Sequence, residues 1–188
     1  MTPVITQAFD PAACALADLT QHIRETHHTY LRAELPLIWD LLREALAASP
    51  AARAEIRAFA QAFGQFRATL DSHLRKEEEI LFPFVEQLER TRQAGMPSPR
   101  HGFGALALPI EILEAEHALG DRLLDRMRPI WQRWALPGDT PAWQRSLGER
   151  LIGLDADMQR HVYVEDAILF PRTIQLEEMP CSSAAGAR

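Results

Sequence analysis

Apolar residues recur at steps of three and four along most of the chain, which is the period of a helix buried on one face. A helix start is indicated at Asp10-Pro11, where a side-chain acceptor precedes a proline. The pattern predicts four helical blocks, at residues 11–48, 50–92, 106–134 and 141–178. No stretch alternates β-branched with polar residues as a half-buried strand would. We therefore expect an all-α protein, folded as an antiparallel four-helix bundle.

Glycine, proline and small polar residues gather at 93–104, which predicts the long connection between two helical pairs. Pro36 and Pro83 lie inside predicted helices, and each is expected to bend its helix because proline lacks an N–H donor. The chain is interpreted as a single domain over residues 1–188, with the bundle at about 11–178. The small, polar residues 179–188 are expected to form a disordered tail.

The second and fourth blocks repeat one motif. The segment HLRKEEEILFPFVEQLE begins at His73, and HVYVEDAILFPRTIQLE begins at His161, 88 residues further on (from 73 to 161). Histidine, glutamate, Ile-Leu-Phe-Pro and Gln-Leu-Glu recur in register. Such a match predicts two homologous helix pairs, and a pseudo-twofold arrangement of these pairs would bring the two motifs face to face.

Composition excludes several classes of function. The 188 residues are 47% hydrophobic and 24% charged, with a net charge of −6, and no basic stripe is present to bind a nucleic acid. No stretch approaches the roughly 20 apolar residues of a membrane span, and the first residues do not resemble a secretory leader. Cys14 and Cys181 are too few and too far apart for a disulfide scaffold or a thiolate-held cluster. We expect a cytoplasmic protein without nucleic-acid or membrane partners.

Each repeat contains His-x-x-x-Glu, as His73 with Glu77 and His161 with Glu165. Residues four apart lie on one face of a helix, so both side chains can reach the same point. Leucines flank the first pair at helical steps, which places it at the border of the apolar face. An ionised carboxylate in that position is costly unless a positive charge compensates it. No lysine or arginine stands at a matching spacing, and metal ions are therefore indicated.

The other two blocks each supply histidines. The third block has His117 among leucines, and the first block has the adjacent pair His27 and His28. Periodicity alone does not choose between His27 and His28. His22 and His101 are interpreted as exposed or hydrogen-bonded residues without a role in the site.

The order and spacing of these motifs resemble the hemerythrin-like (HHE cation-binding) family: His28-x6-Leu35-Pro36, His73-x3-Glu77 with LFP, Glu116-His117, and His161-x3-Glu165 with LFPR. Within that family the chain is most similar to the metal-binding domain of the di-iron repair-of-iron-centres proteins, over about residues 20–175. The resemblance implies a four-helix bundle with one histidine from each helix and two bridging glutamates. The implied metal ligands are His28, His73, Glu77, His117, His161 and Glu165.

The chain also departs from the family pattern. Repair-of-iron-centres proteins usually carry a further N-terminal domain with paired cysteines, whereas only about ten residues precede the first block here. Oxygen-carrying hemerythrins pair the last histidine with an aspartate five residues on, a spacing that Asp166 fits, and they place another histidine where this chain has Asp121. We favour Glu165 over Asp166 because the repeat pairs Glu165 with Glu77.

The resemblance and the mixed nitrogen–oxygen donor set imply two non-haem iron ions with an oxo or hydroxo bridge, while manganese or zinc could occupy the site in purified protein. Expected small ligands are dioxygen, nitric oxide or peroxide. The implied role is in oxidative or nitrosative stress, or in repair of damaged iron–sulfur proteins, and catalytic turnover stays an open question. The alternatives are a protein that binds, stores or senses dioxygen or iron without turnover, and a purely structural bundle.

Overall fold

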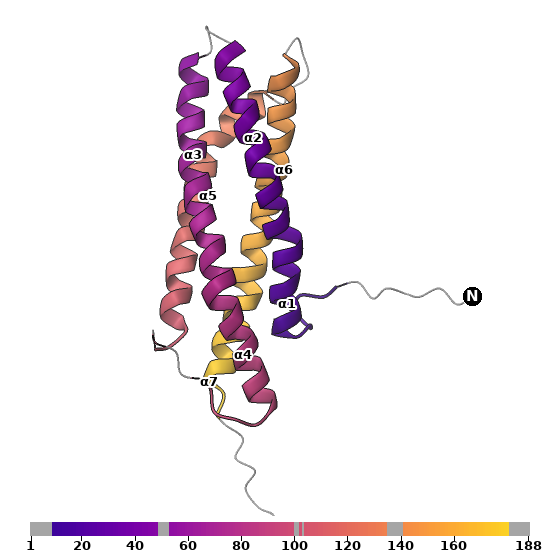
Figure 1. Ribbon diagram of the computed structural model, residues 1–188, viewed down its shortest axis with the longest axis vertical. Coiled ribbons are helices and arrows are strands. Elements are labelled where there is room, and N and C mark those ends of the chain that lie inside the picture. Colours follow the sequence, from indigo (N-terminus) through magenta and orange to yellow (C-terminus); the bar gives the residue numbers. More distant parts are fainter. Residues whose placement is uncertain (1–8, 49–52, 100–101, 103, 135–140, 181–188) are drawn as a thin grey trace, which may run out of the picture.

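The computed structural model describes residues 9–48, 53–99, 102, 104–134 and 141–180, and in this part of the chain four long helical segments form an antiparallel bundle (Figure 1). Three of the segments contain a π turn, here labelled η, between two α-helices. In chain order the segments are α1 (Leu16–Ile23), η1 (Arg24–His28) and α2 (Thr29–Ala48); α3 (Arg53–Lys76), η2 (Glu77–Leu81) and α4 (Phe82–Gln93); α5 (Ala107–Trp134); and α6 (Ala142–Val164), η3 (Glu165–Leu169) and α7 (Phe170–Glu178). The segments pack in a ring, with α2 against α3, α3 against α5, α5 against α6, and α6 against α2.

The predicted all-α bundle is confirmed, and its blocks match the observed segments to within a few residues at most ends. Gly95 and Gly104, in the connection between α4 and α5, have positive φ angles of 68° and 82°, which suit glycine because it has no Cβ. The predicted start of the second block at residue 50 lies outside the described residues. So do His101, Cys181 and the part of the expected tail from residue 181 onward.

The first helix begins later than the sequence predicts. The Asp10 side chain accepts a hydrogen bond from Ala12 N at 3.0 Å and caps a short turn instead of a helix. Helix α1 starts at Leu16, and its first N–H groups are capped from another helix. The Glu89 carboxylate in α4 accepts from Leu16 N at 2.8 Å and from Ala17 N at 3.0 Å. The predicted start at Asp10-Pro11 is therefore wrong, because tertiary packing supplies the cap at a later position.

The two prolines expected to bend their helices differ in effect. Pro83 is the second residue of α4 and directly follows π turn η2, so the regular α pattern is interrupted just before it. Pro171 has the same relation to η3 in the repeat. By contrast, Pro36 lies inside α2, which continues through it as an α-helix. The repeat thus extends to local backbone geometry, because η2 and η3 fall 88 residues apart (from 77 to 165).

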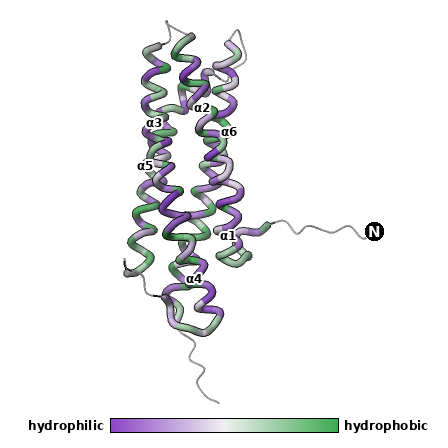
Figure 2. The backbone as a smooth tube through the Cα atoms, in the orientation of Figure 1, coloured by the Kyte–Doolittle hydropathy of each residue, from purple (hydrophilic) through white to green (hydrophobic). Residues whose placement is uncertain are grey.

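Two apolar clusters fill the bundle, and polar and apolar residues alternate along every helix (Figure 2). One cluster joins α2, α3, α5 and α6 around residues such as Phe63 and Leu124. The other joins α1, α4, α7 and the start of α5 around Phe82 and Phe170. The first segment runs from one cluster into the other, since Ile23 belongs to the second cluster and Leu31 to the first. A buried polar layer lies between the clusters.

Across the described residues, none of the helices combines the length and the apolar character needed to cross a membrane.

Candidate metal centre

All six residues predicted as ligands meet in the polar layer between the two apolar clusters. Each is buried, with at most 6% of its surface exposed. They form two groups in which one donor atom of each residue lies within 4.8 Å of the others. Glu77 and Glu165 belong to both groups. The first group is His28, His161, Glu77 and Glu165, and the second is His73, His117, Glu77 and Glu165.

The two glutamates each direct one oxygen to each group. Oε1 of Glu77 lies 3.2 Å from Nε2 of His73, while its Oε2 lies 3.3 Å from Nε2 of His28. Oε1 of Glu165 lies 2.9 Å from Nε2 of His161, and its Oε2 lies 3.2 Å from Nε2 of His117. A carboxylate in this orientation can contact two cations at once. All four imidazoles face the centre through Nε2.

Local helix geometry explains the convergence. His73 and Glu77, and His161 and Glu165, are four residues apart at the ends of α3 and α6, so each pair faces the same side. In the described residues, the three π turns all include one residue of the centre: His28 closes η1, Glu77 opens η2 and Glu165 opens η3. Single π turns are frequent at functional sites. Sequence reasoning missed them, although the Phe-Pro that follows η2 and η3 was a signal.

Two histidines are oriented by carboxylates in equivalent positions of the repeat. Nδ1 of His28 donates to Oε1 of Glu78 at 2.7 Å, and Nδ1 of His117 donates to Oδ1 of Asp166 at 2.8 Å. A carboxylate on the outer nitrogen fixes the tautomer of a metal-binding imidazole and raises its basicity. Asp166 belongs to neither metal group and its side chain is 35% exposed, so in this geometry it supports a histidine while Glu165 faces the centre.

His73 is oriented in the same way by a residue from the neighbouring helix. Its Nδ1 donates to Oε2 of Glu116 at 3.1 Å, and Glu116 is also paired with Lys76. These supporting contacts join α3 and α5, so they could not be deduced from spacing within one helix. Glu116 stood in the family motif, but its role had not been predicted.

Both histidines of the adjacent pair in the first segment are buried. His28 lies in the first metal group, whereas His27 lies in neither. Nδ1 of His27 is 2.9 Å from Oδ1 of Asp157, and its ring stacks on that of His161 with the centroids 5.2 Å apart. His22, interpreted as lying outside the site, is outside both groups and stacks on Phe9.

Several polar atoms at the centre are buried without a hydrogen-bond partner in the described structure. They are Nε2 of His28, both oxygens of Glu77, Oε2 of Glu165 and Nδ1 of His161. Such atoms are costly to bury unless another group satisfies them. All except Nδ1 of His161 face the shared centre, and cations bound there would satisfy them. The donor set therefore fits a pair of metal ions.

The acid–base properties of the centre also favour positive charge. Burial alone would lower the pKa of His117, but its hydrogen bond to Asp166, its close contact with Glu165 and the charges of both carboxylates raise that pKa to about 10. The pKa of His161 is raised as well, because the charge of Glu165 outweighs burial. The pKa of Glu165 is lowered well below its usual range, since nearby histidines outweigh its own burial. The His117 imidazole is thus protonated at neutral pH when no ion is bound, and metal binding must displace a proton from it.

Aromatic rings close the centre on two sides. Phe82 stacks on His28 with the ring centroids 5.6 Å apart, and Phe170 stacks on His117 with the centroids 6.0 Å apart. Leu113 is also buried. Ile80, one turn after Lys76, is 45% exposed and does not shield the centre from water.

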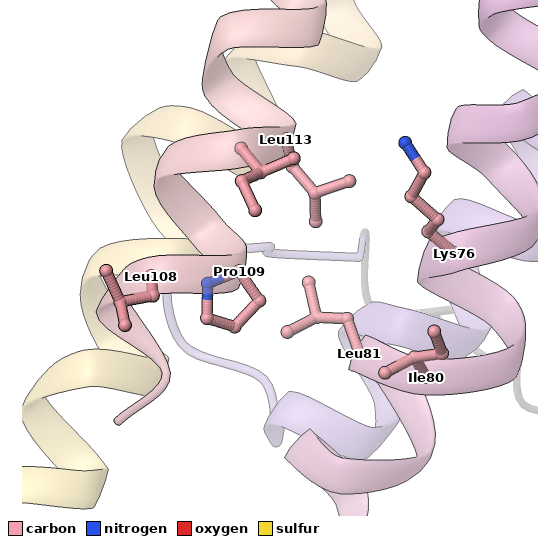
Figure 3. A pocket seen from close by; sticks show the side chains of 7 residues that line it. Lys76, Ile80, Leu81, Leu108, Pro109 and Leu113 are labelled. Atoms are coloured by element: carbon pink, nitrogen blue, oxygen red, sulfur yellow. The ribbon is translucent and has the colours of Figure 1, made fainter. Parts of the chain in front are cut away.

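Ile80 lines an apolar surface pocket of about 300 Å³ between η2 and the start of α5, with Leu108, Pro109 and Leu113 on its opposite wall (Figure 3). None of the six residues of the centre lines this pocket. A much smaller cavity of about 20 Å³ does reach the centre, because His73 and His117 form part of its wall. Its other walls include Phe66, Gly120 and Met158.

The profile of the family described as "Hemerythrin HHE cation binding domain" matches residues 19–173, which include the whole centre. The chain belongs to the hemerythrin HHE cation-binding family. The predicted resemblance is thereby confirmed, and membership agrees with the bundle and with the two buried His/Glu groups.

Among curated relatives, this hemerythrin-like chain is similar to proteins named "Iron-sulfur cluster repair protein YtfE". The relative from Edwardsiella ictaluri is 34% identical over 118 residues, which are 63% of this chain and 48% of that protein. The relative from Enterobacter sp. (strain 638) is 28% identical over 163 residues, or 85% of this chain and 67% of that protein. The relative from Salmonella paratyphi B is 27% identical over 168 residues, or 88% and 69%. The matches thus span about half to two thirds of these relatives.

Proposed function

We propose that the centre binds two iron ions, one between His28 and His161 and the other between His73 and His117, with Glu77 and Glu165 bridging them. The observation that carries this proposal is the orientation of the glutamates. Each directs one oxygen to each histidine pair at 2.9–3.3 Å, as a bridging carboxylate requires. Two carboxylate charges at a fully buried position also need compensation, which two cations supply.

The donor set favours iron over other metals without excluding them. Imidazole and carboxylate donors suit iron, manganese and zinc, whereas a structural zinc site commonly includes thiolates. The four histidines and two glutamates would leave coordination positions free on octahedral ions, as non-haem iron sites do. We therefore propose iron as the resident metal, with manganese or zinc as substitutes in purified protein.

The physiological ligand we propose is a small molecule such as dioxygen, nitric oxide or peroxide. The cavity beside His73 and His117 has a volume of only about 20 Å³, which suits a molecule about the size of water. A bound di-iron pair would supply two electrons to such a molecule. The protein's own contribution is to hold the imidazoles through their Nδ1 contacts and to exclude bulk water with Phe82 and Phe170.

For the biological role we propose a response to oxidative or nitrosative stress that includes repair of damaged iron–sulfur proteins. The name of the YtfE relatives, iron–sulfur cluster repair proteins, supports this role, and the residues that match the family profile include the whole centre. Damaged iron–sulfur proteins would then be the macromolecular partners. The reducing cytoplasm, expected from two isolated cysteines, is the compartment we propose.

One observation favours the alternative, a protein that binds or senses dioxygen or iron without turnover. Each of three carboxylates beside the centre accepts a hydrogen bond from one of its histidines: Glu78, Glu116 and Asp166. A carboxylate engaged in this way is a poor proton donor or acceptor for a bound substrate. Binding without chemistry would need no such group.

The test starts from protein loaded anaerobically with ferrous iron. Its optical spectrum is recorded before and after addition of dioxygen or nitric oxide, and the protein is then incubated with a peroxide-damaged [4Fe–4S] enzyme. Recovery of that enzyme beyond the level given by free ferrous salt supports repair. A spectral change without recovery supports binding or sensing. The double variant Glu77→Gln/Glu165→Gln is the control, and iron retention or recovery equal to that of the unaltered protein would contradict the proposal.

A further inference from the structure

The repeat allows the two halves of the centre to be compared residue by residue. His28 and His117 occupy equivalent positions, since their Nδ1 atoms donate to Glu78 and Asp166, which lie 88 residues apart (from 78 to 166). The distances, 2.7 and 2.8 Å, are nearly equal. For this pair of histidines, the two halves match.

The other two histidines, His73 and His161, also lie 88 residues apart, but their surroundings differ. Nδ1 of His73 donates to Glu116, the residue immediately before His117. The equivalent residue in the other half, immediately before His28, is His27. His27 has no carboxylate that could accept a hydrogen bond from Nδ1 of His161. Its ring lies nearly parallel to that of His161, at an interplanar angle of 10°. In the described residues no hydrogen-bond partner reaches the buried Nδ1 of His161.

In this half, a carboxylate contacts His27 instead of His161. Nδ1 of His27 contacts Oδ1 of Asp157 at 2.9 Å, and Arg160 approaches the same oxygen at 3.6 Å. The equivalent of Asp157 in the other half is Thr69, which lines the small cavity beside His73. Where one half has the carboxylate of Glu116, the other half has the imidazole of His27. That half also has an additional carboxylate, Asp157, one helical turn before His161.

These differences make the two ion positions chemically unequal. At one position both imidazoles, His73 and His117, have a carboxylate on Nδ1. At the other, only His28 does. A carboxylate on the outer nitrogen makes an imidazole a stronger donor, and loss of such a contact typically weakens metal binding about 10–100-fold. His161 is held in place by stacking on His27 but gains no such basicity.

We infer that the protein holds one ion firmly, between His73 and His117, and a second ion more weakly, between His28 and His161. This inference rests on the proposed di-metal function and adds an order of loss: the ion at His161 leaves first. Glu116 is then a positioning residue for the firmly held ion. His27 is the residue that makes the other position exchangeable.

The experiment uses the full chain loaded with two ferrous ions and a colorimetric ferrous chelator under anaerobic conditions. Release of iron is followed with time, and circular dichroism monitors the fold. Two phases of about one ion each are expected. Glu116→Gln should accelerate the slow phase alone, by about 10–100-fold, while Glu78→Gln should accelerate only the fast phase. Glu116→Asp retains a carboxylate and should restore part of the slow phase.

Release of both ions in one phase would overturn the inference while leaving the di-metal function intact. So would acceleration of the fast phase by Glu116→Gln. A chain that binds fewer than two ions when loaded would contradict the proposed function itself, and the inference with it.

Discussion

The two halves of this bundle have the same His-x-x-x-Glu motif and the same backbone irregularity, yet they differ where a neighbouring helix contacts a histidine of the centre. His73-x3-Glu77 and His161-x3-Glu165 end in matching π turns, and a phenylalanine follows each turn at once. The halves differ at Glu116 and its counterpart His27. The repeat therefore keeps the residues that face the centre, while the hydrogen bond to the outer nitrogen of His73 depends on a side chain from another segment.

The repeat also matches at its far end, in Gln-Leu-Glu. Glu89 caps the start of α1, and Glu177, 88 residues later, accepts a hydrogen bond from Leu106 N at 3.0 Å at the start of α5. In both halves, a glutamate near the end of the segment thus caps the start of another helix: α4 caps α1, and α7 caps α5. Variants at equivalent positions of the two halves can be compared for stability and iron binding. Such a comparison shows which properties the two halves share and which differ.

The largest expected effect is on stability. Phe82→Ala and Phe170→Ala each remove a buried ring that packs on a histidine of the centre, and each should lower the free energy of unfolding by about 3–5 kcal/mol. The two losses should be similar, because the sites are equivalent. Urea denaturation of the metal-free proteins measures both. If one variant is as stable as the unaltered protein, the two halves do not contribute equally to the core.

The next effect concerns the bridges. Glu77→Gln and Glu165→Gln preserve size but remove a charge that faces both histidine pairs, so each should weaken iron binding by at least about 10–100-fold. Each should also abolish the magnetic coupling between the ions, as measured by Mössbauer or electron paramagnetic resonance spectroscopy. Loss of one ion with the other unaffected, in either variant, would show that the glutamates do not bridge.

A smaller effect is expected at Asp166. Asp166→Asn retains an acceptor for Nδ1 of His117 but removes its charge, so iron affinity should fall about tenfold, while coupling between the ions persists. Asp121→Asn, at an exposed position of α5, is the matched control and should bind iron normally. Loss of coupling in Asp166→Asn but not in Glu165→Gln would instead assign the bridge to Asp166.

The smallest effect is expected at the helix caps. Glu89→Ala removes two hydrogen bonds to backbone N–H groups of α1 and should destabilise the protein by about 1 kcal/mol. Glu177→Ala removes one such bond and should have a smaller effect. Denaturation midpoints of the two variants test this difference. A larger loss for Glu177→Ala would contradict the unequal capping.

The sequence was sufficient for the bundle, which follows from local periodicity. The six residues that converge also needed the family resemblance, because periodicity does not choose between His27 and His28. Four-residue spacing puts His73 and Glu77 on one face of their helix, independently of tertiary packing. The contacts of Glu116 and His27 could not be predicted, since they depend on how α5 and the first segment rotate against their neighbours. The start of α1 at Leu16 depends on Glu89 for the same reason.

The central claim is a pair of iron ions bridged by two glutamates, and the iron content of the reconstituted chain tests it most directly. The protein is loaded anaerobically with ferrous iron, passed through a desalting column, and analysed for metals and for coupling between the ions. The account predicts about two iron ions per chain, magnetically coupled. One ion per chain, or two ions without coupling, would contradict it.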